Sequence, residues 1–115
     1  MFFPRRTWAL RITERMGLAG NSNETALLVD LLIWSAKEEA ELMKEAIGKT
    51  LSKAEGILMG ALTMVNNHSA IVKVSRDLRI LPQDAEKLLL SMRKSALELA
   101  SENNFDKIVK VATRR

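Results

Sequence analysis

The sequence predicts an all-α fold, a compact bundle of five or six helices that forms a single domain over residues 1–115. Three observations favour this fold. Apolar residues recur at intervals of three and four along nearly the whole chain, which is the spacing of one helix face. No run alternates polar and apolar residues as a half-buried strand does. Hydrophobic residues make up 47 % of the chain and only two residues are proline, which suits one globular core.

The first two helices are separated by a polar loop. Thr7 is expected to cap the first helix, because its hydroxyl oxygen can accept a hydrogen bond from a free amide N–H of the first turn. Gly17 is expected to end this helix, because glycine adopts left-handed conformations. Glycine and asparagine residues then favour a loop. The second helix is expected to begin after Ser22 or Asn23 and to end near Ile47.

Residues 26–34 of the second helix are apolar on almost every side, with Asp30 as their one charge. A carboxylate among apolar residues needs a cationic partner such as Arg11, or its pKa rises by desolvation, so we expect a buried Asp30. The apolar side chains exceed what one side of a helix buries in a small monomer. This excess predicts an oligomer or partner interface, and it supports a homodimer core and a separate protein partner equally. The residues assigned to the interface are Leu28, Leu31, Leu32 and Trp34.

A break in the helical pattern is expected at residues 48–52. Ser52 and Glu55 have the spacing of a capping box, which would open a third helix over residues 53–66. The competing interpretation is one long helix over residues 29–64, because apolar residues there keep the alternating steps of a coiled-coil seam. Glycines inside that stretch favour two helices, since each costs up to about 1 kcal/mol in a helix interior.

Gly56 and Gly60 stand four residues apart in the expected third helix. Small residues at this spacing let two helix backbones approach closely. We therefore expect tight packing inside the chain, with a dimer contact as the alternative.

Turn residues bound the last three helices. Residues 66–69 are polar and predict a loop, and a fourth helix over residues 70–78 follows. Pro82 suits the first position of a helix, so a fifth helix is expected over residues 83–102. Two asparagines then interrupt the pattern before a last short helix over residues 105–112.

Residue types exclude several classes of chemistry. The chain has no cysteine, which excludes disulfides, thiolate zinc sites, iron–sulfur clusters and cysteine nucleophiles. His68 is its one histidine, which excludes multi-histidine metal sites and makes a Ser–His–Asp triad unexpected. We therefore expect no metal, no cofactor and no enzymatic activity.

Basic residues concentrate at both ends of the chain, within a net charge of +4. Residues 1–15 hold four arginines and one glutamate, and residues 107–115 hold four bases and no acid. Such short basic ends bind phosphates in many proteins, because each neutralised phosphate releases counterions.

Membrane segments and leaders are not expected. The longest uncharged apolar run, residues 57–65, is far shorter than the roughly 20 residues that span a bilayer. The first residues lack the apolar core of a secretory signal. We therefore expect a cytoplasmic protein without a membrane partner.

Residues 71–92 resemble the helix-turn-helix of DNA-binding proteins. Four positions carry the resemblance, where that family packs its two helices together: Ser75, Leu78, Ala85 and Leu88. Arg79 stands at the family's turn glycine, and Leu81 stands at its usual serine or threonine cap.

The resemblance implies a mode of DNA contact. In this family the second helix enters the major groove and its first residues meet base edges, a role that falls here to Gln83 and Lys87. Asp84 and Glu86 add negative charge to the same helix. The resemblance places four bases near phosphates: Arg76, Arg79, Arg93 and Lys94. The basic N-terminal end and the fourth helix add further candidates: Arg5, Arg6, Arg11 and Lys73.

The first 35 residues resemble ribbon-helix-helix repressors. Pro4, a short helix, a glycine- and asparagine-containing loop and the start of a hydrophobic helix at Ser22 carry this resemblance. That family has a longer strand before its proline than the three residues that precede Pro4 here.

The expected function is that of a small dimeric DNA-binding protein, a regulator or an accessory factor of the size common in plasmids and phages. The alternative is a non-catalytic adaptor or inhibitor that binds another protein through an apolar helix face. Six bases distinguish the two functions, because one shared face favours nucleic acid and a scattered arrangement favours the adaptor. These bases are Arg5, Arg6, Arg11, Lys73, Arg76 and Arg79.

Overall fold

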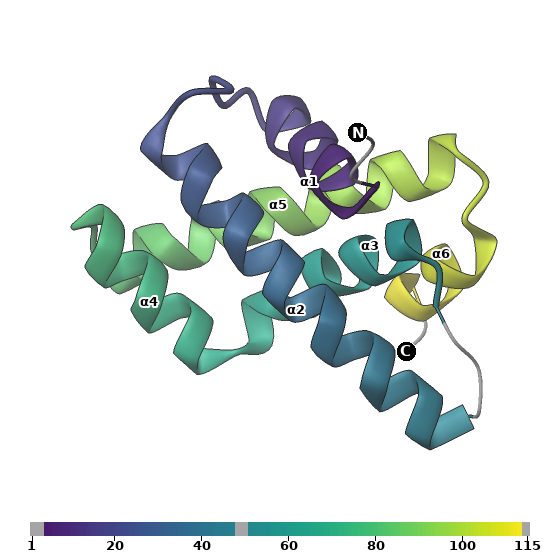
Figure 1. Ribbon diagram of the computed structural model, residues 1–115. Coiled ribbons are helices and arrows are strands. Elements are labelled where there is room, and N and C mark those ends of the chain that lie inside the picture. Colours follow the sequence, from purple (N-terminus) through teal and green to yellow (C-terminus); the bar gives the residue numbers. More distant parts are fainter. Residues whose placement is uncertain (1–3, 48–50, 114–115) are drawn as a thin grey trace.

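The structure is a computed structural model that describes residues 4–47 and 51–113. The described residues form six α-helices and one 3-10 turn within 39 × 31 × 23 Å (Figure 1). The all-α prediction is therefore confirmed. Five or six helices were expected, and the described residues form six. The elements are α1 (Pro4–Arg15), α2 (Asn23–Ile47), α3 (Lys53–Thr63), η1 (Met64–Asn66), α4 (His68–Leu78), α5 (Pro82–Glu102) and α6 (Asp106–Thr113).

Helices α2 and α3 are separate, so the two-helix interpretation is confirmed and the single long helix is not formed. Residues 48–50 of the expected break lie outside the described residues. The Ser52 hydroxyl oxygen accepts a 3.1 Å hydrogen bond from the Glu55 amide, and the Glu55 carboxylate accepts one of 3.0 Å from the Ser52 amide. This is the predicted capping box, which pairs amides that the first turn of a helix leaves free.

Helix α3 forms the middle layer of the fold. It packs against α2 and against α5, and α1 contacts all three of these helices. Figure 1 shows α2 crossing the front of the molecule while α5 runs behind it. The largest fully buried apolar side chains come from α1, α2, α3, α5 and α6: Ile12, Leu28, Leu32, Ile57, Leu58, Leu89, Met92 and Ile108.

Two glycines allow α3 to approach α2 closely. A Cβ atom added at Gly56 would lie 3.3 Å from the Ala36 carbonyl oxygen, and one added at Gly60 would lie 3.0 Å from the Ser35 hydroxyl oxygen. Both distances are shorter than ordinary van der Waals contact. The pair therefore serves packing inside the chain, as the sequence predicted.

Side chains of α1 contact the C-terminal end of α5 and the residues that follow it. The rings of Trp8 and Phe105 meet edge to face with their centroids 5.3 Å apart. The Arg11 guanidinium lies over the Trp8 ring, 4.6 Å from its centroid, and Arg15 forms an ion pair with Glu102. These contacts fix α1 beside the connection between α5 and α6.

Two helices begin earlier than predicted. Helix α1 begins at Pro4 rather than at the expected threonine cap, because proline fits a first turn, where its missing N–H needs no partner. Helix α4 begins at His68, inside the expected polar loop. The Asn67 side chain caps it by accepting a 3.3 Å hydrogen bond from the Ala70 amide. The polar residues 66–69 therefore form a turn and also contain the start of helix α4.

Candidate functional site

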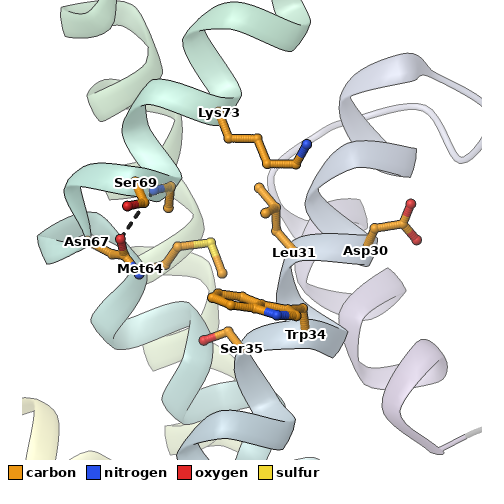
Figure 2. A pocket seen from close by; sticks show the side chains of 9 residues that line it. Asp30, Leu31, Trp34, Ser35, Met64, Asn67, Ser69 and Lys73 are labelled. Carbon is orange, nitrogen blue, oxygen red and sulfur yellow. Dashed lines mark hydrogen bonds between the residues drawn. The ribbon is translucent and has the colours of Figure 1, made fainter.

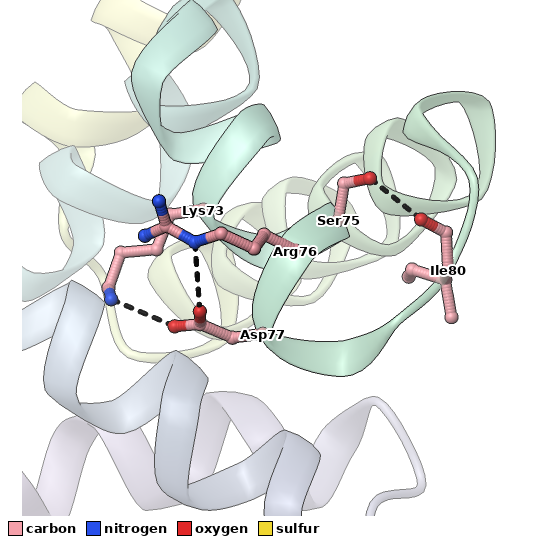
Figure 3. Close-up of polar contacts among 5 residues, drawn as sticks. All are labelled: Lys73, Ser75, Arg76, Asp77 and Ile80. Carbon is pink, nitrogen blue, oxygen red and sulfur yellow. Dashed lines mark hydrogen bonds and ion pairs between the residues drawn. The ribbon is translucent and has the colours of Figure 1, made fainter.

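Helix α4 and the first half of α5 are joined by a short turn, and we name this part of the chain, residues 68–94, the α4–α5 corner. At the glycine position of the resemblance, Arg79 has φ 55° and ψ 47°, the left-handed conformation that glycine favours. The Ser75 hydroxyl donates a 2.7 Å hydrogen bond to the Ile80 carbonyl oxygen (Figure 3), and the Ile80 amide bonds to the Ser75 carbonyl at 3.0 Å. The turn is therefore fixed on α4 by both its backbone and a side chain.

The helices of the corner pack through the positions that carry the resemblance. Ala85 is fully buried, and Ser75, Leu78 and Leu88 are half-buried. Helix α4 rests on α5 along this side. The opposite side of α5 is left to solvent.

The outer side of α5 carries an exposed row of residues spaced by four, three and four positions: Gln83, Lys87, Leu90 and Lys94. This spacing keeps the four side chains on one face of a helix. The row offers one amide, two ammonium groups and one apolar side chain. Asp84 and Glu86 are also exposed and place two carboxylates at the start of the same helix.

An ion-pair cluster lies on the exposed side of α4. The Lys73 Nζ lies 2.8 Å from one carboxylate oxygen of Asp77, and the Arg76 Nε lies 3.4 Å from the other (Figure 3). The hydrogen bond from Lys73, and after it the one from Arg76, holds the pKa of the Asp77 carboxyl below its ordinary value. With two cations and one carboxylate, the cluster keeps one positive charge at neutral pH.

A second basic surface lies along the other flank of α2, where α1 packs (Figure 1). Four cations from three helices surround a shallow hollow of about 330 Å³, which we name the basic hollow: Arg5, Arg6, Lys37 and Lys53. None of the four forms an ion pair with a side chain that the structure describes. Sequence reasoning missed Lys37 and Lys53, because only the fold brings them to Arg5 and Arg6.

The bases whose arrangement distinguishes the two functions are divided among separate places. Helix α1, with Arg5 and Arg6, packs on α2, α3 and α5, whereas α4 packs on α2, η1 and α5. Arg11 is held over the Trp8 ring. Arg93 was expected near phosphates, but it is half-buried and its Nη2 donates a 3.2 Å hydrogen bond to the carbonyl oxygen of Ala112. Arg93 therefore holds the end of α6.

An apolar cleft of about 400 Å³ lies between α2, η1 and α4, and we name it the α2–α4 cleft (Figure 2). Its apolar lining comes from four residues: Leu31, Trp34, Met64 and Ala70. Polar residues complete the lining: Asp30, Ser35, Asn67, Ser69 and Lys73. The Trp34 side chain is 52 % exposed, so the cleft opens beside a large aromatic surface.

The assignment of α2 leucines to an interface is corrected by their burial. Leu28 and Leu32 are fully buried in the core of this chain, and Leu31 is 7 % exposed. Helices α1, α3 and α4 all pack against α2, so more than one side of α2 is covered within this chain. Trp34 alone of the predicted interface set is available to a partner.

The expectation for Asp30 is also wrong. Asp30 is exposed and forms no ion pair with a described residue. Ala26, Asp30 and Trp34 follow one another at helical spacing along the outer side of α2, and all three are exposed. The charge marks the solvent side of the helix rather than a buried site.

Within the two described stretches of chain, no helix is long and apolar enough to cross a membrane. Nor do these stretches bring together three or more His, Asp or Glu side chains in a group that could hold a metal ion. No protein-family model matches the chain, and neither a curated protein nor a solved structure matches it.

Proposed function

We propose that the protein binds DNA through the α4–α5 corner. The observation that carries this proposal is the turn, in which Arg79 takes the left-handed conformation at the glycine position and Ser75 bonds to Ile80. The turn leaves the start of α5 projecting, because Leu81, Pro82 and the two residues after them are exposed. A helix presented by its first turn fits the major groove and offers its first side chains to base edges.

Each residue of the outer row of α5 has a role in this proposal. Gln83 has the donor and acceptor that pair with adenine, and Lys87 has the donors that guanine accepts. Lys94, farther along the helix, and Arg79, at the turn, contact phosphates. Asp84 repels phosphates, so the affinity depends on the surrounding bases. Because these bases neutralise phosphates, the affinity falls steeply with salt.

The basic hollow supplies a second contact with phosphates. No carboxylate of a described residue pairs with its four cations, so a phosphate meets no competing partner there. Release of counterions from the nucleic acid makes such contacts favourable at low salt. Lys37 and Lys53 thus join Arg5 and Arg6 as phosphate-binding residues.

Fluorescence anisotropy with a labelled random-sequence duplex, at about 50 and 200 mM salt, tests the proposal. We expect binding that weakens steeply between these two concentrations. Replacement of a phosphate-binding base, as in Arg79→Gln or Lys94→Gln, lowers the slope of log affinity against log salt by about one. Ser101→Ala, at an exposed position near the end of α5, is the control that removes no base, and the slope stays unchanged.

Two results would contradict this function. One is an absence of duplex binding at the lower salt by protein whose helical circular dichroism shows that it is folded. The other is a salt slope that falls with Lys53→Gln and stays constant with both corner variants, which would leave the basic hollow as the only nucleic-acid contact.

A second candidate function is that of a non-catalytic adaptor or inhibitor that binds another protein. The division of the predicted bases among separate surfaces favours it, and so does the half-exposed indole of Trp34. Exposed aromatic residues often anchor protein interfaces. A partner retained by the wild type and lost with Trp34→Ala would identify this function. The expected homodimer stays a prediction, and sedimentation velocity measures it.

A further inference from the structure

The α2–α4 cleft has the size and lining of a small-molecule site. Its volume of about 400 Å³ lies within the roughly 300–1,000 Å³ of ligand pockets, which are mainly apolar with a few polar groups. Figure 2 shows the Trp34 indole lying between the two sides of the cleft, next to the Met64 thioether. A ring inserted here would exchange water for contacts with both side chains.

A serine hydroxyl that bonds to no described residue lines the cleft. Ser35 is only 9 % exposed, and its hydroxyl forms no hydrogen bond with any residue that the structure describes. No side-chain oxygen or nitrogen in the described part of the chain is both buried and unpaired, so the Ser35 oxygen must still reach solvent. Ser35 lines the cleft, which provides that route. The Ser35 hydroxyl is therefore left to bond with water or with a ligand atom in the cleft.

The polar side of the cleft is rich in hydrogen-bond donors. The Asn67 oxygen is occupied by the Ala70 amide, which leaves the Asn67 side-chain NH2 to donate. Lys73 uses one of its three N–H groups on Asp77. The cluster of Lys73, Asp77 and Arg76 keeps one positive charge beside the cleft. Asp30 also borders the cleft, but its carboxylate is directed away from it in Figure 2.

We propose that the α2–α4 cleft binds a small organic acid. Its aromatic or aliphatic body lies against Trp34 and Met64, and its carboxylate accepts hydrogen bonds from Lys73 and Asn67. Ser35 pairs with a polar atom of the ligand at the base of the cleft. The surplus donors of Lys73 and Asn67 select the acid over an amine of the same shape, because the Asp30 carboxylate is directed away from the cleft (Figure 2). The proposal does not rest on DNA binding, although Lys73 belongs to the α4–α5 corner as well.

Three probes of one shape test the charge selection: 4-phenylbutanoate, 4-phenylbutan-1-ol and 4-phenylbutylamine. Titrations of the full chain are followed by the indole N–H resonance of Trp34 in two-dimensional NMR, with the Trp8 resonance as an internal control. We expect the acid to shift the Trp34 resonance and to leave that of Trp8 in place. The acid binds about fivefold more tightly than the alcohol, as one partly exposed charged contact allows, and the amine binds most weakly.

Two charge variants move the acid affinity in opposite directions. Lys73→Met keeps the side-chain stem and removes the ammonium group, so the acid loses its advantage over the alcohol. Asp77→Asn frees Lys73 and adds a net positive charge, so the acid binds more tightly. The alcohol affinity stays constant in both variants, which shows that the cleft is still formed. Lys107→Met is the matched control and changes neither affinity.

Four outcomes would overturn the proposal. The amine binds as tightly as the acid, none of the probes moves the Trp34 resonance at millimolar concentration, or the two charge variants leave the acid affinity unchanged. A Trp34 resonance that moves with protein concentration alone, together with a dimer in sedimentation velocity, overturns it as well, because a second copy of the chain then covers the cleft.

Discussion

The Ser75 hydroxyl donates a 2.7 Å hydrogen bond to the Ile80 carbonyl oxygen and so joins the last turn of α4 to the residue that follows Arg79. Helix ends leave carbonyl oxygens without intrahelical partners, and a left-handed residue commonly reverses the chain there. In this protein the Ser75 side chain donates a hydrogen bond to the Ile80 carbonyl oxygen, which lies just after the reversal. The direction in which α5 leaves the turn is therefore set by a residue of α4.

Ser75→Ala removes this hydrogen bond and leaves the half-buried Ile80 carbonyl without its partner. The free energy of unfolding falls by about 1 kcal/mol, the usual contribution of one such bond. Urea unfolding followed by tryptophan fluorescence measures the change. Ser91→Ala, at an exposed position of α5, is the control and changes the stability by less than about 0.5 kcal/mol. Equal losses in the two variants would show that the Ser75 bond contributes nothing.

Arg79→Gly removes a side chain from a left-handed residue. The free energy of unfolding rises by about 0.5–1 kcal/mol, because the relief of strain exceeds the added entropy of the unfolded chain. Arg76→Gly, inside α4, is the matched control and lowers it by about 1 kcal/mol. Arg79→Gly also weakens DNA binding if the proposed function is right, so stability and affinity change in opposite directions. A destabilised Arg79→Gly would contradict the left-handed turn.

Gly60→Ala places a methyl group 3.0 Å from the Ser35 hydroxyl oxygen and 3.2 Å from the Ser35 Cβ, where α3 meets α2. The helices must separate or Ser35 must rotate, so the free energy of unfolding falls by about 1–3 kcal/mol. A Cβ at Gly20 meets no atom within 4 Å, so Gly20→Ala changes the stability by less than about 0.5 kcal/mol. Thermal unfolding of the two variants makes the comparison. A Gly60→Ala protein as stable as the wild type would disprove the close approach.

The pKa of the Asp77 carboxyl lies below its ordinary value, and an NMR titration of its carboxyl carbon measures the shift. Because the folded-state pKa is lowered, the stabilisation from this group is present at neutral pH and is lost as the pH falls below the ordinary aspartate range. Lys73→Met removes the largest cause, so the pKa rises toward its ordinary value. Lys110→Met on α6 is the control and leaves it in place. An unaltered pKa in Lys73→Met would show that the ion pair does not persist in solution.

Features decided by neighbours in the sequence could be predicted. The capping box of Ser52 and Glu55 and the proline start of α5 at Pro82 depend on residues within one helical turn, and both are formed. The two glycines of α3 were also placed correctly, because a close helix contact needs small residues at that spacing.

Features that depend on which helices meet could not be predicted from one sequence. Residues 26–34 of α2 are apolar around most of the helix circumference, so the solvent side there is decided by where α1, α3 and α4 cover it. The burial of Leu28 and the exposure of Asp30 follow from that covering. The basic hollow could not be predicted for the same reason, because Lys37 and Lys53 are distant in sequence from Arg5 and Arg6. The cleft beside Trp34 likewise depends on which helices meet.

Among the described elements, helix α5 packs against α1, α3, η1, α4 and α6, whereas the main contacts of α4 are with α2, η1 and α5. Detaching α4 leaves most of the contacts of α5 intact, but detaching α5 dismantles the whole molecule. Amide protons in the middle of α5 therefore exchange with solvent only through global unfolding, while those of α4 exchange through a smaller opening at lower free energy. The protein thus carries its most readily opened helix directly beside its most protected one.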